Sequence, residues 1–176
     1  MIDTLGEFER IVRGSPAPTS NDVSEALSFQ QHPFETRNIH PDLPARVRKL
    51  FDDGYLPESV LTAFKYLDVE VKRMSGIRRK TGYELMTHAF GSKPPVIALN
   101  RGATDSDEDE QRGYRDLFAG ATAGIRNPRG HEVYVPDTPD QALDYLALAS
   151  LLLRKLDAVG RQAPHASGSV MAKHHG

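Results

Sequence analysis

Hydrophobic residues recur at every third or fourth position along much of this chain, which is the spacing of one face of an α-helix. The clearest stripe begins near Pro57 and ends at Gly76, since proline suits a helix start and glycine commonly follows a helix end. Its apolar members are Val60, Phe64, Leu67, Val71 and Met74. The charged residues between them, Lys65 and Asp68 included, are expected on a solvated face of this helix.

The same spacing predicts further helices over residues 43–53, 82–90, 114–126 and 140–158. The last of these is apolar on more than one side, which indicates a central or interface helix. Residues 94–100 form a short apolar run after two prolines, and this run could be a lone strand or extended packing. We therefore expect an all-α bundle of about four to five main helices.

Composition divides the chain into three parts. Residues 1–37 comprise an amphipathic pattern at 2–13 and a linker rich in proline and serine. Residues 38–159 are expected to form the compact helical domain. Residues 160–176 are rich in glycine, serine and histidine and are predicted to be a disordered tail.

Charge and residue usage exclude several classes of function. The formal net charge is −2, so any nucleic-acid binding must rest on a local basic patch. The chain has no cysteine, which excludes disulfides, thiolate metal sites and a thiol nucleophile. No apolar run reaches the ~18 residues of a membrane span, and no signal-peptide core is evident. By default we expect a cytoplasmic protein that has no membrane partner.

Two charged stretches carry weaker predictions. Thr104–Glu110 is acidic, and the Ser106–Asp109 spacing resembles a helix capping box. A Mg²⁺ or Ca²⁺ site is the alternative there, although no glycine-punctuated calcium loop is present. Arg78–Lys80 is a basic turn that could be surface charge or a phosphate contact. Since no cluster has convincing metal-ligand spacing, no metal and no cofactor are predicted.

The candidate chemistry lies in the stretch Gly124–His131. Arg126 is permanently charged and can hold phosphate oxygens, while the imidazole of His131 can move a proton near neutral pH. Pro128 disfavours helical geometry at Asn127, so the motif is predicted at a helix-to-loop junction. The alternative is a polar helix cap followed by a surface turn.

Several stretches, in order along the chain, match one family. They are Leu50–Tyr55, Ala63–Leu67, Gly82–Met86, Glu110–Gly113, Leu117–Ala121, Gly124–Pro128 and His131. Over roughly residues 38–157 the chain resembles the HEPN superfamily, and within it the Ymh-type family of prokaryotic and phage genomes. The resemblance implies an all-α HEPN-like bundle that usually dimerises and, in active members, a metal-independent ribonuclease.

The resemblance also implies roles for particular residues and partners. Arg126 and His131 would be the catalytic pair, and Asn127 is the polar residue that typically follows the arginine. Arg129 is not part of the family pattern and could contact a substrate phosphate, as could Lys65. Such proteins often act as toxins or abortive-infection effectors against phage, with an antitoxin or nucleotidyltransferase partner.

The reaction that this predicts is attack of an RNA 2′-hydroxyl on the adjacent phosphate. His131 would transfer the proton, and Arg126 would stabilise charge on the phosphate oxygens. Separate acid and base would come most simply from two motifs that meet across the two-fold axis of a homodimer. The rival is a non-catalytic HEPN-like module that binds a nucleotide or a protein.

Overall fold

The structure, a computed structural model, describes residues 31–131 and 136–162. The chain divides into two compact units, Met1–Thr36 and Arg37–Gly176. The first contributes only the short helix α3 (Pro33–Thr36) to the described residues. The amphipathic pattern at 2–13 lies outside them, as does the tail from residue 163 onward.

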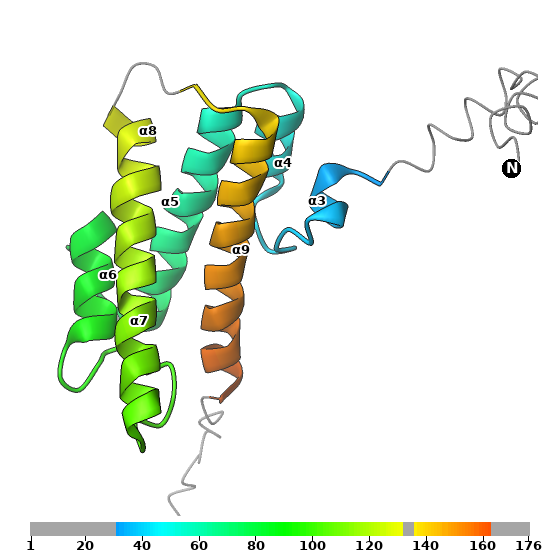
Figure 1. Cartoon of the computed structure of the whole chain (residues 1–176). Coiled ribbons are helices and arrows are strands. Elements are labelled where there is room, and N and C mark those ends of the chain that lie inside the picture. Colours follow the sequence, from blue (N-terminus) through cyan, green and yellow to red (C-terminus); the bar gives the residue numbers. More distant parts are fainter. Residues whose placement is uncertain (1–30, 132–135, 163–176) are drawn as a thin grey trace, which may run out of the picture. The chain divides into compact units, whose positions relative to one another are not determined.

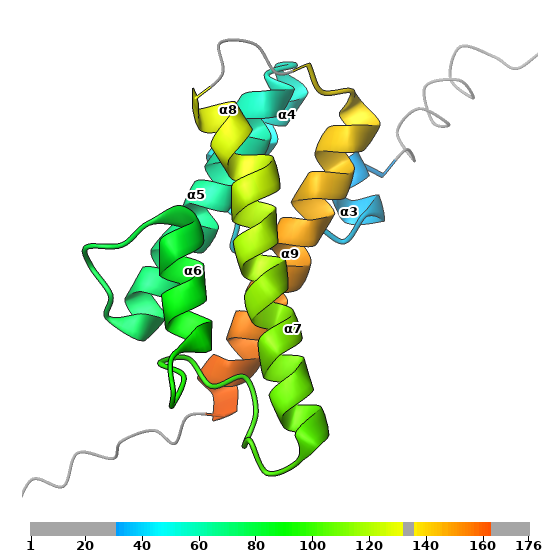
Figure 2. The same ribbon diagram turned by 60° about the vertical axis from the view of Figure 1, so that its left-hand side comes forward.

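The second unit is a helical bundle. Its elements are α4 (Ala45–Asp52), α5 (Leu56–Ser75), α6 (Gly82–Gly91), α7 (Asp105–Ala121), a π-helical segment η1 (Thr122–Arg126), α8 (Asn127–His131) and α9 (Pro139–Gln162). The described residues contain no strand, so the predicted all-α class is confirmed for them. Figures 1 and 2 show α7, η1 and α8 as one continuous rod. Helix α9 continues past residue 158 into the predicted tail.

Helix α5 is the centre of the bundle, because it packs against α4, α6, α9 and the upper end of the rod. Its start carries a proline in the first turn, and Gly76 ends it with a left-handed φ of 70°. Its fully buried apolar side chains are Val60, Ala63, Phe64, Leu67 and Val71. Each such valine, leucine or phenylalanine stabilises the fold by about 1.5–3 kcal/mol relative to an exposed one.

The segment between α6 and α7 is extended packing rather than the lone strand that its sequence also allowed. The Gln111 side chain on α7 accepts the Leu99 N–H at 2.8 Å and donates to the carbonyls of Phe90 and Ile97 at 2.8 and 3.1 Å. One side chain thus satisfies three backbone groups, so the segment needs no partner strand. The buried Ile97 and Leu99 fasten it to the core.

The start of α7 corrects the predicted cap. Thr104, not Ser106, is the N-cap, and Asp107 completes the capping box by accepting the Ala103 and Thr104 N–H groups. Asp109 instead pairs with Arg112 on the helix surface. Because Asp107 is used in this way, the acidic stretch serves the helix start rather than a cation.

Candidate functional site

The motif that was predicted at a helix-to-loop junction remains helical throughout. Thr122–Arg126 forms a π turn, in which the Asn127 N–H reaches the Thr122 carbonyl, and α8 continues to His131. The prediction of a loop at this point is therefore wrong. A π turn inside an α-helical rod is a rare feature that is often found at functional sites.

Pro128 explains why the turn widens. In a regular α-helix its ring would clash with the carbonyl four residues earlier, at Gly124. A π turn moves that carbonyl away from the ring. A Cβ atom added to Gly124 would meet no atom within 4 Å, so there is open space beside this residue. Thr122 also bonds the Phe118 carbonyl at 2.9 Å, a local contact that often bends helices. The helix thus continues past Pro128 because a π turn, which has a larger radius, directly precedes the proline.

The π turn directs Arg126 toward α5 and the start of α6. Its Nη1 donates to Asn127 Oδ1 at 3.1 Å, and its Nη2 lies 3.9 Å from Asp68 Oδ2. The Nε atom is buried without a hydrogen-bond partner among the described residues, although the side chain as a whole is 20% exposed. The guanidinium is thus held in place while much of its donor capacity stays unused.

Asp68 is the residue of this site that the sequence analysis placed wrongly. It is buried rather than solvated, and its Oδ2 accepts the Gly82 N–H at 3.2 Å, while Oδ1 has no hydrogen-bond partner in the described part of the chain. Burial raises the pKa of the Asp68 carboxyl above its ordinary value, and the Gly82 N–H, Arg126 and Lys72 offset the rise only in part. A signal was present, because Asp68 is four residues after Phe64 and three before Val71, on the apolar side of α5.

Arg129 occupies a different environment from Arg126. Its Nε donates to Asp137 Oδ2 at 2.8 Å, its Nη2 to Asp137 Oδ1, and its Nη1 to the Ile125 carbonyl at 2.8 Å. The guanidinium also lies 4.4 Å from the ring centre of Tyr145 on α9. The two side chains of the ion pair are only 4% and 3% exposed. Arg129 therefore braces α8 against the segment that leads into α9, and its substrate role stays a prediction.

His131 is exposed at the last position of α8 and forms no hydrogen bond or ion pair with a described residue. Five residues of helix separate it from Arg126, a rise of about 7.5 Å and a turn of about 140°. The two side chains consequently point to different sides of the rod, and no contact between them is present among the described residues. Arg126 and His131 of one chain are therefore close in sequence but do not face the same side of the helix.

Lys65 lies on the part of α5 that faces the rod. A Cβ atom added to Gly130 of α8 would lie 3.9 Å from Leu61 Cδ1 of α5, and Asp68 of α5 lies beside Arg126. Lys65 falls between these two points, four residues after Leu61 and three before Asp68, and is exposed. Helical spacing therefore puts Lys65 near the side of α5 that faces the motif, and its substrate role stays a prediction.

A family model described as a protein of unknown function, Hypoth_ymh, matches residues 37–156. The chain belongs to the Ymh family. The match includes α4 through α8 and most of α9, so the family's shared region contains the whole Arg126 site. No curated protein and no solved structure matches the chain. None of the described helices has the length and apolar character to cross a membrane.

The described part of this Ymh chain contains one group of side chains with the composition of a metal site. Ligand atoms of His40, Asp42 and Asp157 lie within 4.8 Å of one another. The ring of His40 is already occupied, because Nδ1 accepts the Asp42 N–H at 3.2 Å and Nε2 lies 3.0 Å from Asp157. With Nδ1 as acceptor, the proton is on Nε2, where a metal would have to bind. The group fastens the segment before α4 to α9.

The buried carboxyl predicts a pH-dependent difference between wild type and Asp68→Asn. The native state holds the Asp68 proton more tightly than the unfolded chain, so stability is lost as pH rises from the ordinary pKa through the raised one. Asparagine can still accept the Gly82 N–H but cannot ionise. We expect Asp68→Asn to gain stability relative to wild type over that range and the gain to level off above it.

Urea unfolding of both proteins from acid to neutral pH measures this difference. Since other titrating groups are common to both proteins, their effects cancel in it. A difference that does not change with pH, or one that falls as pH rises, would contradict the raised pKa.

Proposed function

We propose that this chain is a metal-independent endoribonuclease of the HEPN superfamily. Arg126 stabilises charge on the scissile phosphate, and His131 transfers the proton of the attacking 2′-hydroxyl. Asn127 orients the guanidinium through its side-chain oxygen, and the exposed Lys65 beside the motif contacts a neighbouring phosphate.

The contrast between the two arginines of the motif supports this proposal. Arg129 uses its donors on Asp137 and a carbonyl inside the fold, as a structural arginine does. Arg126 is equally anchored in the helical rod, yet makes one hydrogen bond of 3.1 Å and one ion pair of 3.9 Å. A partly exposed guanidinium with unused donors at a π turn suits an anionic ligand that is itself only bound transiently.

The geometry of the pair favours a composite site. Because Arg126 and His131 point to different sides of one rod, we propose a homodimer in which two motifs meet across a two-fold axis. One His131 then removes the 2′-hydroxyl proton while the other protonates the leaving 5′-oxygen. Sedimentation of an active sample checks the dimer, and full activity of a monomer would contradict the composite site.

The resemblance supports a toxin or phage-defence role for the reaction, with an antitoxin or a nucleotidyltransferase as partner. The rival function, a non-catalytic nucleotide- or protein-binding module, is favoured by the contacts of Arg126 with Asn127 and Asp68. In that case the arginine merely braces the junction of α5, α6 and the rod.

Cleavage of single-stranded RNA in excess EDTA separates the two functions. We expect fragments that end in a 2′,3′-cyclic phosphate, because the nucleophile belongs to the substrate. The same sequence as DNA lacks the 2′-hydroxyl and should survive. Cleavage that EDTA abolishes, or equal cleavage of the DNA, would overturn the proposal.

A further inference from the structure

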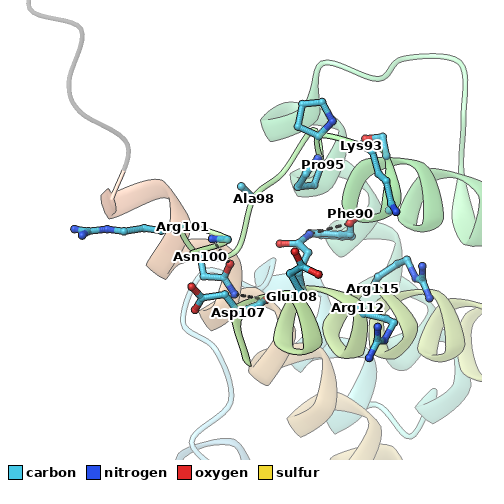
Figure 3. A pocket seen from close by; sticks show the side chains of 15 residues that line it. Phe90, Lys93, Pro95, Ala98, Asn100, Arg101, Asp107, Glu108, Arg112 and Arg115 are labelled. Atoms are coloured by element: carbon cyan, nitrogen blue, oxygen red, sulfur yellow. Dashed lines mark hydrogen bonds between the residues drawn. The ribbon is translucent and has the colours of Figure 1, made fainter. Parts of the chain in front are cut away.

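A surface pocket of about 650 Å³ lies between the start of α7 and the segment that precedes it. Figure 3 shows Lys93, Arg112 and Arg115 at one end of the pocket, with Asn100, Arg101 and Asp107 at the other. Pro95 and Ala98 of the preceding segment lie between the two ends, opposite Glu108 of α7. The pocket therefore has a cationic end beside an apolar wall.

The three cations at that end, which we call the Lys93 cluster, are accessible to an anion. Lys93 is exposed and has no ion-pair partner among the described residues. Arg112 and Arg115 pair with Asp109 and Asp116, all on the surface of α7. Such exposed pairs contribute about 0–1 kcal/mol, so a phosphate can take the place of the carboxylates at little cost.

Helix α6 connects the Lys93 cluster to Arg126. The first residue of α6, Gly82, lies beside Arg126, and the last, Gly91, lies beside Arg115. Arg126 and Arg115 therefore lie on the side of the rod that faces α6, at opposite ends of that helix. The ten residues of α6 set a separation of about 14 Å.

Two further features fit a nucleic-acid strand between these ends. Tyr83, in the first turn of α6, is 55% exposed. An exposed aromatic ring is a stacking surface for a base. At Gly91 a Cβ atom would come within 2.8 Å of Arg115 Cδ, so the missing side chain leaves room for the arginine stem.

We propose that the Lys93 cluster is a second phosphate-binding subsite, which holds a single RNA strand that runs along α6 from Arg126. This inference rests on the proposed function, because it assigns the path of the same substrate. A phosphate a few nucleotides from the scissile one binds Lys93, Arg112 and Arg115, and Tyr83 stacks on a base between them. The strand gains affinity and a fixed direction from this subsite, while the chemistry stays at Arg126 and His131.

The test measures binding of a fluorescent 2′-O-methyl RNA strand, which can bind but cannot be cleaved. We expect Lys93→Ala to weaken binding about tenfold and to lower the log–log salt slope by about 0.7, the value for one lost phosphate contact on a single strand. Gly91→Ala should also weaken binding, because it displaces the stem of Arg115. The control is Arg101→Ala, which removes one positive charge from the other end of the same pocket.

A dinucleotide substrate separates this inference from the proposed function. It reaches only the Arg126 site, so Lys93→Ala should leave its cleavage unchanged while reducing cleavage of a longer strand. If neither RNA is cleaved, the nuclease proposal fails, whereas the binding assay still decides the subsite. Equal losses for Lys93→Ala and Arg101→Ala would overturn the subsite. Lys93-dependent binding of inorganic phosphate or a mononucleotide without any effect on the strand would also overturn it.

Discussion

His131→Ala should reduce RNA cleavage by about 10²–10⁴-fold while leaving the fold intact. This is the usual loss when a side chain that transfers protons in the transition state is removed. His131 is exposed at the end of α8 and bonds no described residue, so its removal leaves no buried group unpaired. Exposed substitutions of this kind change stability by about 0.5 kcal/mol or less.

The measurement is the rate of cleavage of one RNA at saturating protein in excess EDTA, with melting temperatures and binding of the 2′-O-methyl strand alongside. His88→Ala on α6 is the matched control, since it removes another exposed histidine. A His131→Ala protein that cleaves normally would refute the proposed mechanism. One that unfolds would instead favour a structural role for the motif.

Arg126→Ala is a less direct test of the proposed mechanism than His131→Ala. Replacing a residue at an exposed junction would change the free energy of unfolding little, but Arg126 lies against the buried Asp68. Its removal takes away a charge that partly offsets the raised pKa of the Asp68 carboxyl. Lost activity in Arg126→Ala therefore has to be separated from lost stability, for which Arg126→Ala in the Asp68→Asn background is suitable.

Arg129→Ala should destabilise the protein by about 3–5 kcal/mol, the usual cost of leaving one member of a buried ion pair alone. Arg129 and Asp137 expose only 4% and 3% of their side chains, and all three guanidinium nitrogens of Arg129 donate hydrogen bonds. The substitution also removes the contact with the Tyr145 ring. Equilibrium unfolding in urea measures the loss, with Arg112→Ala as the control.

Arg112 pairs with Asp109 through one nitrogen, and its side chain is 63% exposed, so we expect about 0–1 kcal/mol there. Replacing both buried partners, as Arg129→Met with Asp137→Leu, should recover much of the stability because no charge is left unpaired. If Arg129→Ala instead weakens RNA binding at unchanged stability, Arg129 is a substrate contact rather than a brace.

Local sequence determined most of the helix boundaries. Pro57 marks the start of α5 because it has no backbone N–H to leave unpaired in the first turn, and Gly76 marks the end because it adopts a left-handed φ. Both effects depend only on the residues of one helical turn. The sequence analysis named Ser106 as the cap, although Thr104 also has an acidic residue three positions later. The choice of Thr104 depended on Asn100 and Gln111, which tie the preceding segment to α7 through the Asp107 and Leu99 backbones.

The tertiary structure alone decided which polar residues of the motif region are structural. The periodicity of α5 places Asp68 near its apolar side, but the contacts that bury the carboxyl come from α6 and the rod, which pack around it. Arg126 and Arg129 are both motif-region arginines in the sequence. Arg129 forms a hydrogen-bonded ion pair with Asp137, brought close by the approach to α9, whereas Arg126 lies 3.9 Å from Asp68 without a hydrogen bond to it. Sequence spacing specifies which residues share a turn, whereas the partner of a charge comes from a distant part of the chain and depends on how the helices pack.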